Sequence, residues 1–156
     1  MKSILLVDDE ALICAEFKRT LEGFGFQVST AHTLETALRS TRKTQFDAIL
    51  LEFNLRSERR AHPTTGNGVK LLRRVRAMHI AVPILMFTAM TGEPYESASI
   101  EAGADEFIPK TVGISSLVSR VGAHIRRRER DLRKASAGTS SHSVSRSSES
   151  TRRQSL

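Results

Sequence analysis

Five polar side chains follow short apolar runs in this sequence, and their types suit the binding of a metal ion and a phosphoryl group. They are three carboxylates, one hydroxyl and one ammonium: Asp8, Asp9, Glu52, Thr88 and Lys110. Carboxylates gathered together repel one another by about 4 kcal/mol per pair at a separation of roughly 4 Å, so we expect a cation among them. Mg²⁺ prefers such oxygen ligands, while Thr88 and Lys110 offer a hydrogen bond and a positive charge to an anion on the metal. These residues therefore predict a phosphoryl-binding site.

These side chains meet only if the apolar runs before them are neighbouring parallel strands. The expected strands are Ser3–Val7, Gln27–Ala31, Ala48–Leu51, Pro83–Phe87 and Glu106–Ile108. Between them apolar residues recur at helical spacing, most weakly in the fourth helix, Pro94–Ala102. This alternation predicts an α/β fold, a doubly wound five-stranded parallel sheet in a three-layer sandwich. In such sheets the ligand crevice lies at the carboxyl ends of the strands, where the five polar residues stand.

The charge of the chain is unevenly distributed along its length. Residues 1–125 carry 15 Lys/Arg and 14 Asp/Glu, whereas residues 126–156 carry 9 and 3. We expect one folded domain over residues 1–125, a basic extension of the last helix over 126–134, and a disordered Ser/Arg-rich tail over 135–156. The tail has too few apolar side chains to offset the entropy lost on ordering.

The sequence also argues against several classes of protein. No apolar run approaches the roughly 18 residues that cross a bilayer, and the first run meets acidic residues too early for a signal peptide. The single cysteine, Cys14, agrees with a reducing compartment, so we expect a cytoplasmic location without membrane insertion. No histidine is expected in the crevice, and no glycine-rich nucleotide loop follows a strand. The chain is therefore not expected to be an enzyme.

Each candidate residue also has an ordinary structural explanation. Asp9 suits the N-cap of the first helix, threonine ends many strands, and a lone lysine such as Lys110 is commonly solvated. Cys14 is more simply a core residue than a reactive thiol. The functional interpretation depends on all the polar residues following the expected strands together.

Four segments carry this pattern in a recognisable form: ILLVDDE, FDAILLEFNL, PILMFTA and GADEFIPK. Over residues 1–125 the chain resembles bacterial two-component response-regulator receiver domains, which are CheY-like. The resemblance implies a flavodoxin-like sheet with strand order 2-1-3-4-5. It also implies an acidic pair that holds Mg²⁺, an aspartate after the third strand that accepts phosphate from a histidine kinase, and a threonine and a lysine that stabilise the phosphoryl group.

Carried onto this chain, the resemblance implies a role for particular residues. The implied metal ligands stand at four positions: Asp8, Asp9, Glu52 and Asn54. Thr88 matches the switch hydroxyl, Lys110 matches the lysine, and Phe107 stands at the position of the switch aromatic residue.

The acceptor position departs from the family pattern because it holds Glu52 where an aspartate is usual. The added methylene moves the carboxylate by about 1.5 Å, the length of a C–C bond. A misplacement near 1 Å costs on the order of 10²-fold in reactions that depend on alignment. We therefore expect inefficient phosphorylation and weakened Mg²⁺ binding.

The loops beside the site depart from the pattern as well. Arg56 and Thr111 replace two family prolines, and Thr111 argues against the cis bond that usually follows the lysine. The loop after the third strand is longer than usual and carries Arg59, Arg60 and His62. This loop is more simply a solvated insertion than an anion-binding element.

Two functional hypotheses follow within the family. In the first, the chain is an atypical single-domain response regulator in which Glu52 imitates a phosphorylated aspartate by reaching toward Thr88 and Lys110. It would then signal by protein contact without needing phosphate. In the second, Glu52 is a slow but conventional phosphoacceptor.

The expected partners are a histidine kinase or phosphotransfer protein and a downstream protein target. A homodimer through the face of the fourth helix, fifth strand and fifth helix is also allowed. The basic extension, which begins at Arg126–Arg127–Arg128, leaves open an alternative in which the chain binds nucleic acid or an anionic surface non-specifically. Nucleic acid is not the expected partner, because no sequence-reading motif accompanies these charges.

Overall fold

The computed structural model describes residues 1–55 and 66–140 of the chain. Strands and helices alternate along it, beginning with β1 (Lys2–Val7), α1 (Ala11–Gly23), β2 (Phe26–Ala31), α2 (Leu34–Lys43) and β3 (Ala48–Leu51). They continue with α3 (Asn67–Ala77), β4 (Ile84–Thr88), α4 (Glu93–Glu101), β5 (Glu106–Pro109) and α5 (Ile114–Ser140). All five expected strands are confirmed, with ends that differ by a single residue at most.

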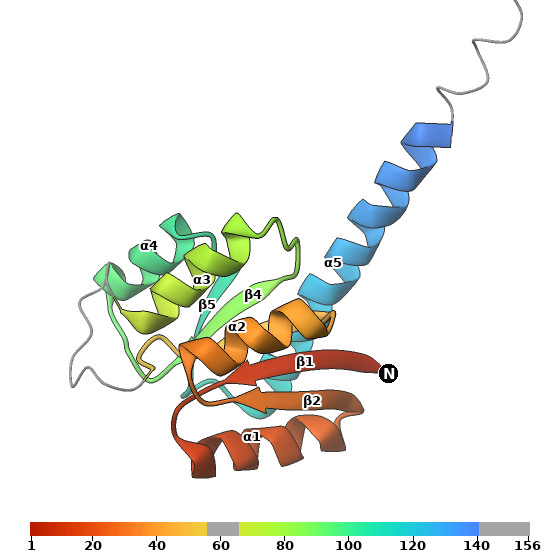
Figure 1. Cartoon of the computed structure of the whole chain (residues 1–156). Coiled ribbons are helices and arrows are strands. Elements are labelled where there is room, and N and C mark those ends of the chain that lie inside the picture. The colour runs from red at the N-terminus through yellow and green to blue at the C-terminus, as the bar shows by residue number, and fades with distance from the viewer. Residues whose placement is uncertain (56–65, 141–156) are drawn as a thin grey trace, which may run out of the picture.

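The strands form one parallel sheet in the order β2-β1-β3-β4-β5, as the resemblance implied (Figure 1). Val7 pairs in register with both Ala31 and Leu51, and Thr88 pairs with Pro109. The carboxyl ends of the strands therefore lie at one edge of the sheet, and the residues that follow them start from the same level.

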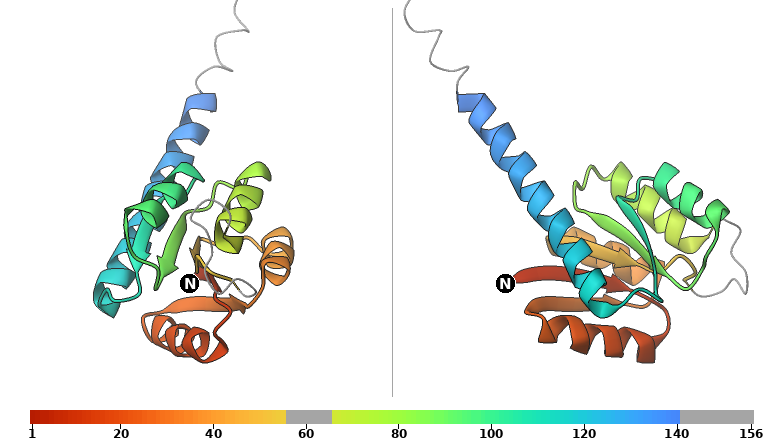
Figure 2. Two further views of the ribbon diagram at one scale, coloured as in Figure 1. Left: turned by 90° about the vertical axis from the view of Figure 1, so that its left-hand side faces the viewer. Right: turned by 180° about the vertical axis from the view of Figure 1, so that it is seen from behind.

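Helices cover both faces of the sheet, which gives the three-layer sandwich (Figure 2). Leu5 and Val7 point into a core shared with α2 and α3, while Ile4 and Leu6 point into a second core shared with α1 and α5. All four side chains of this run are at most 1% exposed. The absence of polar alternation in β1 thus reflects burial on both faces.

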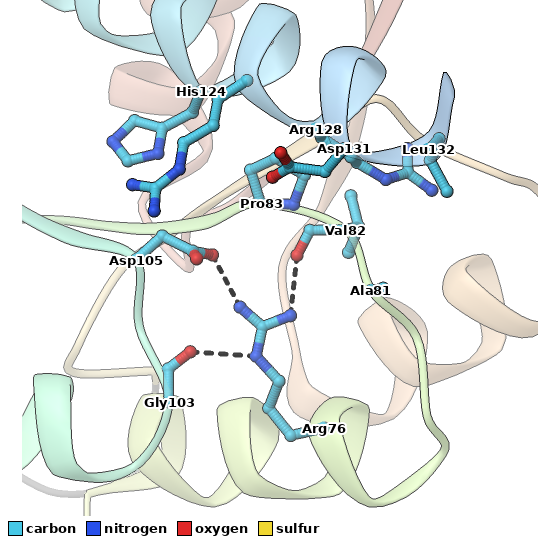
Figure 3. A pocket seen from close by; sticks show the side chains of 11 residues that line it. Arg76, Ala81, Val82, Pro83, Gly103, Asp105, His124, Arg128, Asp131 and Leu132 are labelled. Carbon is cyan, nitrogen blue, oxygen red and sulfur yellow. Dashed lines mark hydrogen bonds and ion pairs between the residues drawn. The ribbon is translucent and has the colours of Figure 1, made fainter. Parts of the chain in front are cut away.

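Arg76, near the end of α3, connects this helix through hydrogen bonds and an ion pair to the loops before β4 and β5 (Figure 3). Its guanidinium donates to the carbonyl oxygens of Gly103 at 2.9 Å and Val82 at 2.7 Å, and pairs with Asp105 at 2.7 Å. Asp105 also accepts a hydrogen bond from the backbone N–H of Ile84 at 2.8 Å. One side chain therefore holds three segments together at the amino end of the sheet.

The last helix is longer than the sequence predicted. The expectation of a disordered segment from Ala135 onward is wrong for residues 135–140, because α5 continues to Ser140. Alanines at two of these positions are strong helix formers, and extending an existing helix adds one hydrogen bond for each residue that is fixed. Residues 141–156, and the loop residues Arg56, Arg59, Arg60 and His62, lie outside the described part of the chain.

The helix α5 runs past the edge of the sheet, so that its second half projects from the domain (Figures 1 and 2). Lys2 at the start of β1 pairs with Glu129 on this helix, and Arg128 reaches the carbonyl oxygen of Phe46 at 3.5 Å. These contacts anchor the helix at the point where it leaves the sheet.

Candidate functional site

The carboxyl edge of the sheet gathers four of the five candidate side chains into one buried cluster. Asp8 and Glu52 are 2% and 6% exposed, and Thr88 is fully buried. Their backbones are fixed by extension of the strand ladder: the N–H of Glu52 donates to Val7, and the N–H of Lys110 donates to Thr88, each at 2.8 Å. The residues after neighbouring strands therefore meet, as the sequence predicted.

Lys110 lies between the two buried carboxylates. Its ammonium nitrogen is 2.5 Å from Oδ2 of Asp8 and 2.8 Å from Oε2 of Glu52. Burial lowers the pKa of Lys110, but the hydrogen bonds to Asp8 and Glu52 outweigh burial and leave this pKa above its ordinary value. The side chain is therefore a fixed ammonium at neutral pH.

The second oxygen of Glu52 is also engaged. Its Oε1 accepts a short hydrogen bond from the hydroxyl of Thr88 and another from the backbone N–H of Asn54 at 3.1 Å. The Thr88 oxygen in turn accepts from the backbone N–H of Met90 at 3.0 Å. The longer side chain of glutamate thus places one carboxylate against both the hydroxyl and the ammonium of the cluster.

The side chains as arranged do not fit a Mg²⁺ ion. Both Glu52 oxygens are taken, and Oδ1 of Asp8 accepts from the backbone N–H of Glu10 at 2.9 Å. Across residues 1–55 and 66–140, no group of three acidic, histidine or cysteine side chains is placed to hold a metal ion. In the described part of the chain the cation between Asp8 and Glu52 is the Lys110 ammonium, and the expected metal set of Asp8, Asp9, Glu52 and Asn54 stays a prediction.

Asn54 and Asp9 occupy places that the sequence alone did not predict. The N–H of Asn54 points to Glu52, and its side-chain oxygen Oδ1 is buried with no hydrogen-bond partner in the described structure. Asp9 is half-buried, and the N-cap of α1 is Glu10, so the suggestion that Asp9 caps this helix is wrong.

One histidine lies at this edge of the sheet, contrary to expectation. His32 directly follows β2, and its Nδ1 is 2.8 Å from the backbone oxygen of Asp8. Its position after Ala31 was visible in the sequence, and the rule that found the other residues identifies it too. Because His32 contacts backbone and not the carboxylates, it fixes the turn after β1 and adds no general base to the cluster.

Gly68 makes room for the loop that carries Glu52. A side chain at this position would place its Cβ 2.5 Å from the carbonyl oxygen of Phe53 and 2.8 Å from the Phe53 Cα, too close for any residue but glycine. The Gly68 N–H donates to that same carbonyl at 3.0 Å. The start of α3 therefore packs directly on the backbone behind Glu52.

Among residues 1–55 and 66–140, no helix combines the length and the apolar character that would let it cross a bilayer. Phe107, on β5, stands at the position that the resemblance assigns to the switch aromatic residue. Its side chain is half-buried and packs against the core shared with α2 and α3, so its ring is partly shielded from solvent.

Comparison with known proteins agrees with this geometry. Residues 4–122 match the family model described as the response regulator receiver domain. The chain is 36% identical over 125 residues to the transcriptional regulatory protein PrrA of Mycobacterium leprae (strain TN), covering 80% of this chain and 50% of PrrA. It is 32% identical over 127 residues to the KDP operon transcriptional regulatory protein KdpE of Escherichia coli (strain K12), covering 81% and 52%.

Among solved structures, a CheY-like response regulator receiver domain protein from Methanospirillum hungatei JF-1 superposes with a TM-score of 0.74 at 25% identity, covering 84% of this chain and 98% of that one. The chain spans about half the length of the curated relatives it matches. The sheet order, the cluster at its carboxyl edge and these matches lead to one conclusion: the chain belongs to the response regulator receiver domain family of two-component signalling proteins.

Proposed function

We propose that this chain is an atypical receiver in which Glu52 holds the conformation that phosphorylation would otherwise favour. The observation that carries the proposal is the pair of contacts made by one carboxylate, to the Thr88 hydroxyl and to the Lys110 ammonium. Charge-assisted hydrogen bonds of this kind are about twice as strong as neutral ones. A carboxylate that makes both contacts biases the loop after β4 without any covalent modification.

The bias would reach the surface through the loop that follows Thr88. The Thr88 oxygen holds the N–H of Met90, which lies just before α4. On α4 the side chain of Ile100 is 47% exposed, while Leu117 and Val121 of α5 are buried in the core. Protein partners would therefore read the α4 side of the α4-β5-α5 face, either as a downstream target or as a second copy of the chain in a homodimer.

The signalling partners follow from the family. A histidine kinase or a phosphotransfer protein would lie upstream and a protein target downstream, with the receiver acting in the cytoplasm and turning over no substrate. Mg²⁺ would enter the cluster only by displacing Lys110 from Glu52 or Asp8, so its binding would be weak.

Exposure to a small phosphodonor with Mg²⁺, followed by intact mass measurement, tests the proposal. The wild-type protein should stay unmodified while Glu52→Asp, which restores the usual acceptor, gains one phosphoryl group. Stoichiometric, Mg²⁺-dependent phosphate on wild-type Glu52 would instead establish the alternative of a slow conventional acceptor. That alternative is kept because Asp8, Thr88 and Lys110 surround Glu52 as a complete set.

A second measurement tests the conformational part. In backbone NMR spectra, Glu52→Gln loses the charge seen by Lys110 and should shift the signals of Met90 and α4. Glu52→Ala should shift them further in the same direction, because it also loses the acceptor for Thr88. Unchanged α4 signals in both variants would show that Glu52 does not bias this face.

A further inference from the structure

The projecting half of α5 presents two chemically different sides. The side toward the domain carries His124, Arg128, Asp131 and Leu132. These residues line one wall of a pocket, and Arg76, Gly103 and Asp105 line the opposite wall (Figure 3). This side continues the stripe of α5 residues buried against the sheet, which ends at Ile125. The opposite side of the helix faces solvent.

The solvent side carries a row of four cationic residues, named here the basic stripe: Arg126, Arg130, Arg133 and Lys134. At 3.6 residues per turn their side chains fall within about 100° of the helix circumference. Leu132, the one large apolar residue between Arg126 and Ser140, lies about 240° from Arg126. The basic stripe is thus a continuous polar face and not part of an amphipathic surface.

The basic stripe keeps an excess of positive charge in the part of the chain that the structure describes. All four residues are exposed, and within the described ranges no carboxylate forms an ion pair with any of them. Two acidic residues flank Arg130 in sequence: Glu129 pairs with Lys2 and also feels the charge of Arg133, and Asp131 is exposed on the side toward the domain. Such a row of like charges on a rigid helix creates a field that attracts a polyanion.

We propose that the basic stripe binds the phosphate backbone of nucleic acid without reading its sequence. The four charges span about 12 Å of helix axis, in steps of about 6, 4.5 and 1.5 Å, a length that covers roughly three to four phosphates of one strand at about 3.4 Å each. A membrane surface fits less well, because a helix that lies in a lipid interface buries an apolar face, and this stripe has none beside it. The sequence did not favour nucleic acid as a partner because no sequence-reading motif accompanies these charges, but binding to the phosphate backbone needs none; all four residues lie within α5, which continues to Ser140.

Fluorescence anisotropy of two unrelated labelled 20-base-pair duplexes, titrated with full-length protein from 50 to 200 mM salt, tests this proposal. Four phosphate contacts give a slope of log affinity against log salt of about −3.6, or on the order of 10²-fold weaker binding across this range. Equal affinity for both duplexes is expected. No binding at 50 mM salt, or a clear preference for one duplex, would overturn the proposal.

Matched variants separate the basic stripe from net charge. Replacing its four residues by glutamine should reduce the magnitude of the slope by about 3.6. The control replaces four exposed cationic residues on α1 and α2 by glutamine, with the same change in net charge: Arg19, Arg39, Arg42 and Lys43. This control should bind as the wild type does, and an equal loss in both variants would show that only overall charge matters.

Two further outcomes decide the class of partner. Vesicles containing phosphatidylserine should not compete with the duplex; vesicle binding without duplex binding would assign the stripe to membranes instead. Polyglutamate at equal charge should compete poorly, and displacement as effective as that by unlabelled duplex would show that any polyanion suffices and overturn the nucleic-acid assignment. Helix content by circular dichroism should be the same in every variant, since glutamine is a good helix former.

Discussion

The ammonium nitrogen of Lys110 lies 2.8 Å from Oε2 of Glu52, in a cluster where both side chains are almost entirely buried. The same nitrogen contacts Asp8 at 2.5 Å. Two carboxylates removed from water are strongly destabilising unless a cation and hydrogen-bond donors compensate them. In this chain the compensation comes from its own lysine, from Thr88 and from backbone N–H groups.

Replacing Lys110 by methionine should lower the free energy of unfolding at pH 7 by about 3–5 kcal/mol, the usual cost of leaving a buried charge without its partner. Urea denaturation measures this loss. Lys43→Met, which changes an exposed lysine, is the control and should alter stability by less than about 0.5 kcal/mol.

The stability difference between the wild type and Lys110→Met should also depend on pH. The folded-state pKa of Lys110 lies above its ordinary value of 10.5, so its contribution to stability is fully present below that value and is lost as the pH rises through the folded-state pKa. The difference in unfolding free energy between wild type and Lys110→Met should therefore be constant from pH 7 to about 10 and shrink above about 10.5. A difference that grows with pH would contradict the assignment of Lys110 as a buried ammonium.

Shortening Glu52 to aspartate should increase Mg²⁺ affinity by on the order of tenfold, within the range seen when the partners of a ligand are changed. The carboxylate retreats by about 1.5 Å from Thr88 and Lys110, which frees oxygens for the metal. Isothermal titration calorimetry measures the affinity, with Glu52→Gln as the control that should gain none. Wild-type affinity equal to that of Glu52→Asp would show that Lys110 does not compete with the ion.

Gly68→Ala should destabilise the protein by about 3 kcal/mol or more, because the new methyl group would meet the backbone of Phe53 and not a movable side chain. Thermal unfolding followed by circular dichroism measures the change. Gly23→Ala, where nothing lies within 4 Å of the added Cβ, is the control and should be neutral or slightly stabilising. Similar melting temperatures for the two variants would mean that the start of α3 can move away from β3.

The rule that polar residues directly after parallel strands meet at one edge of the sheet predicted most of this site. Its failures have a common cause. Short apolar runs that alternate with segments of helical spacing predicted five parallel strands. The register of these strands then placed Asp8, Glu52, Thr88 and Lys110 at one edge. The rule says where a side chain starts and not which partner it selects. That Lys110 would take the place of a metal depends on side-chain rotamers and reach, which sequence spacing does not determine.

The errors along the chain have local explanations. The low apolar content of residues 135–140 predicts disorder, but these residues need only extend a helix that already exists. His32 directly follows β2, so its place at this edge of the sheet is predictable from the sequence by the same pattern as Asp8 and Glu52. The contacts of Arg76 with three segments could not be predicted, because they link residues far apart in sequence through backbone carbonyls that no side-chain pattern reveals.

Arg76→Met should cost about 2–4 kcal/mol of unfolding free energy, since it removes the donor to the Gly103 and Val82 carbonyl oxygens and the cation that pairs with Asp105 (Figure 3). Arg76→Lys should recover only part of this loss because one ammonium cannot reproduce the planar fork. Urea denaturation of both variants measures the effect. The exposed Arg74 provides the control, and Arg74→Gln with a loss as large as that of Arg76→Met would refute the special role of Arg76.

Cys14 should react slowly with disulfide reagents in the folded protein. The side chain is 1% exposed, and burial raises the pKa of its thiol from 9.0 to about 11. At pH 8 the reactive thiolate fraction is then on the order of 10²-fold smaller than for a thiol of ordinary pKa, and limited access slows the reaction further. Absorbance after addition of a disulfide reagent should show a slow native reaction and a fast one in denaturant. A native rate within threefold of the denatured rate would mean that α1 opens readily from the sheet, and this core could not then hold Asp8 rigidly in place.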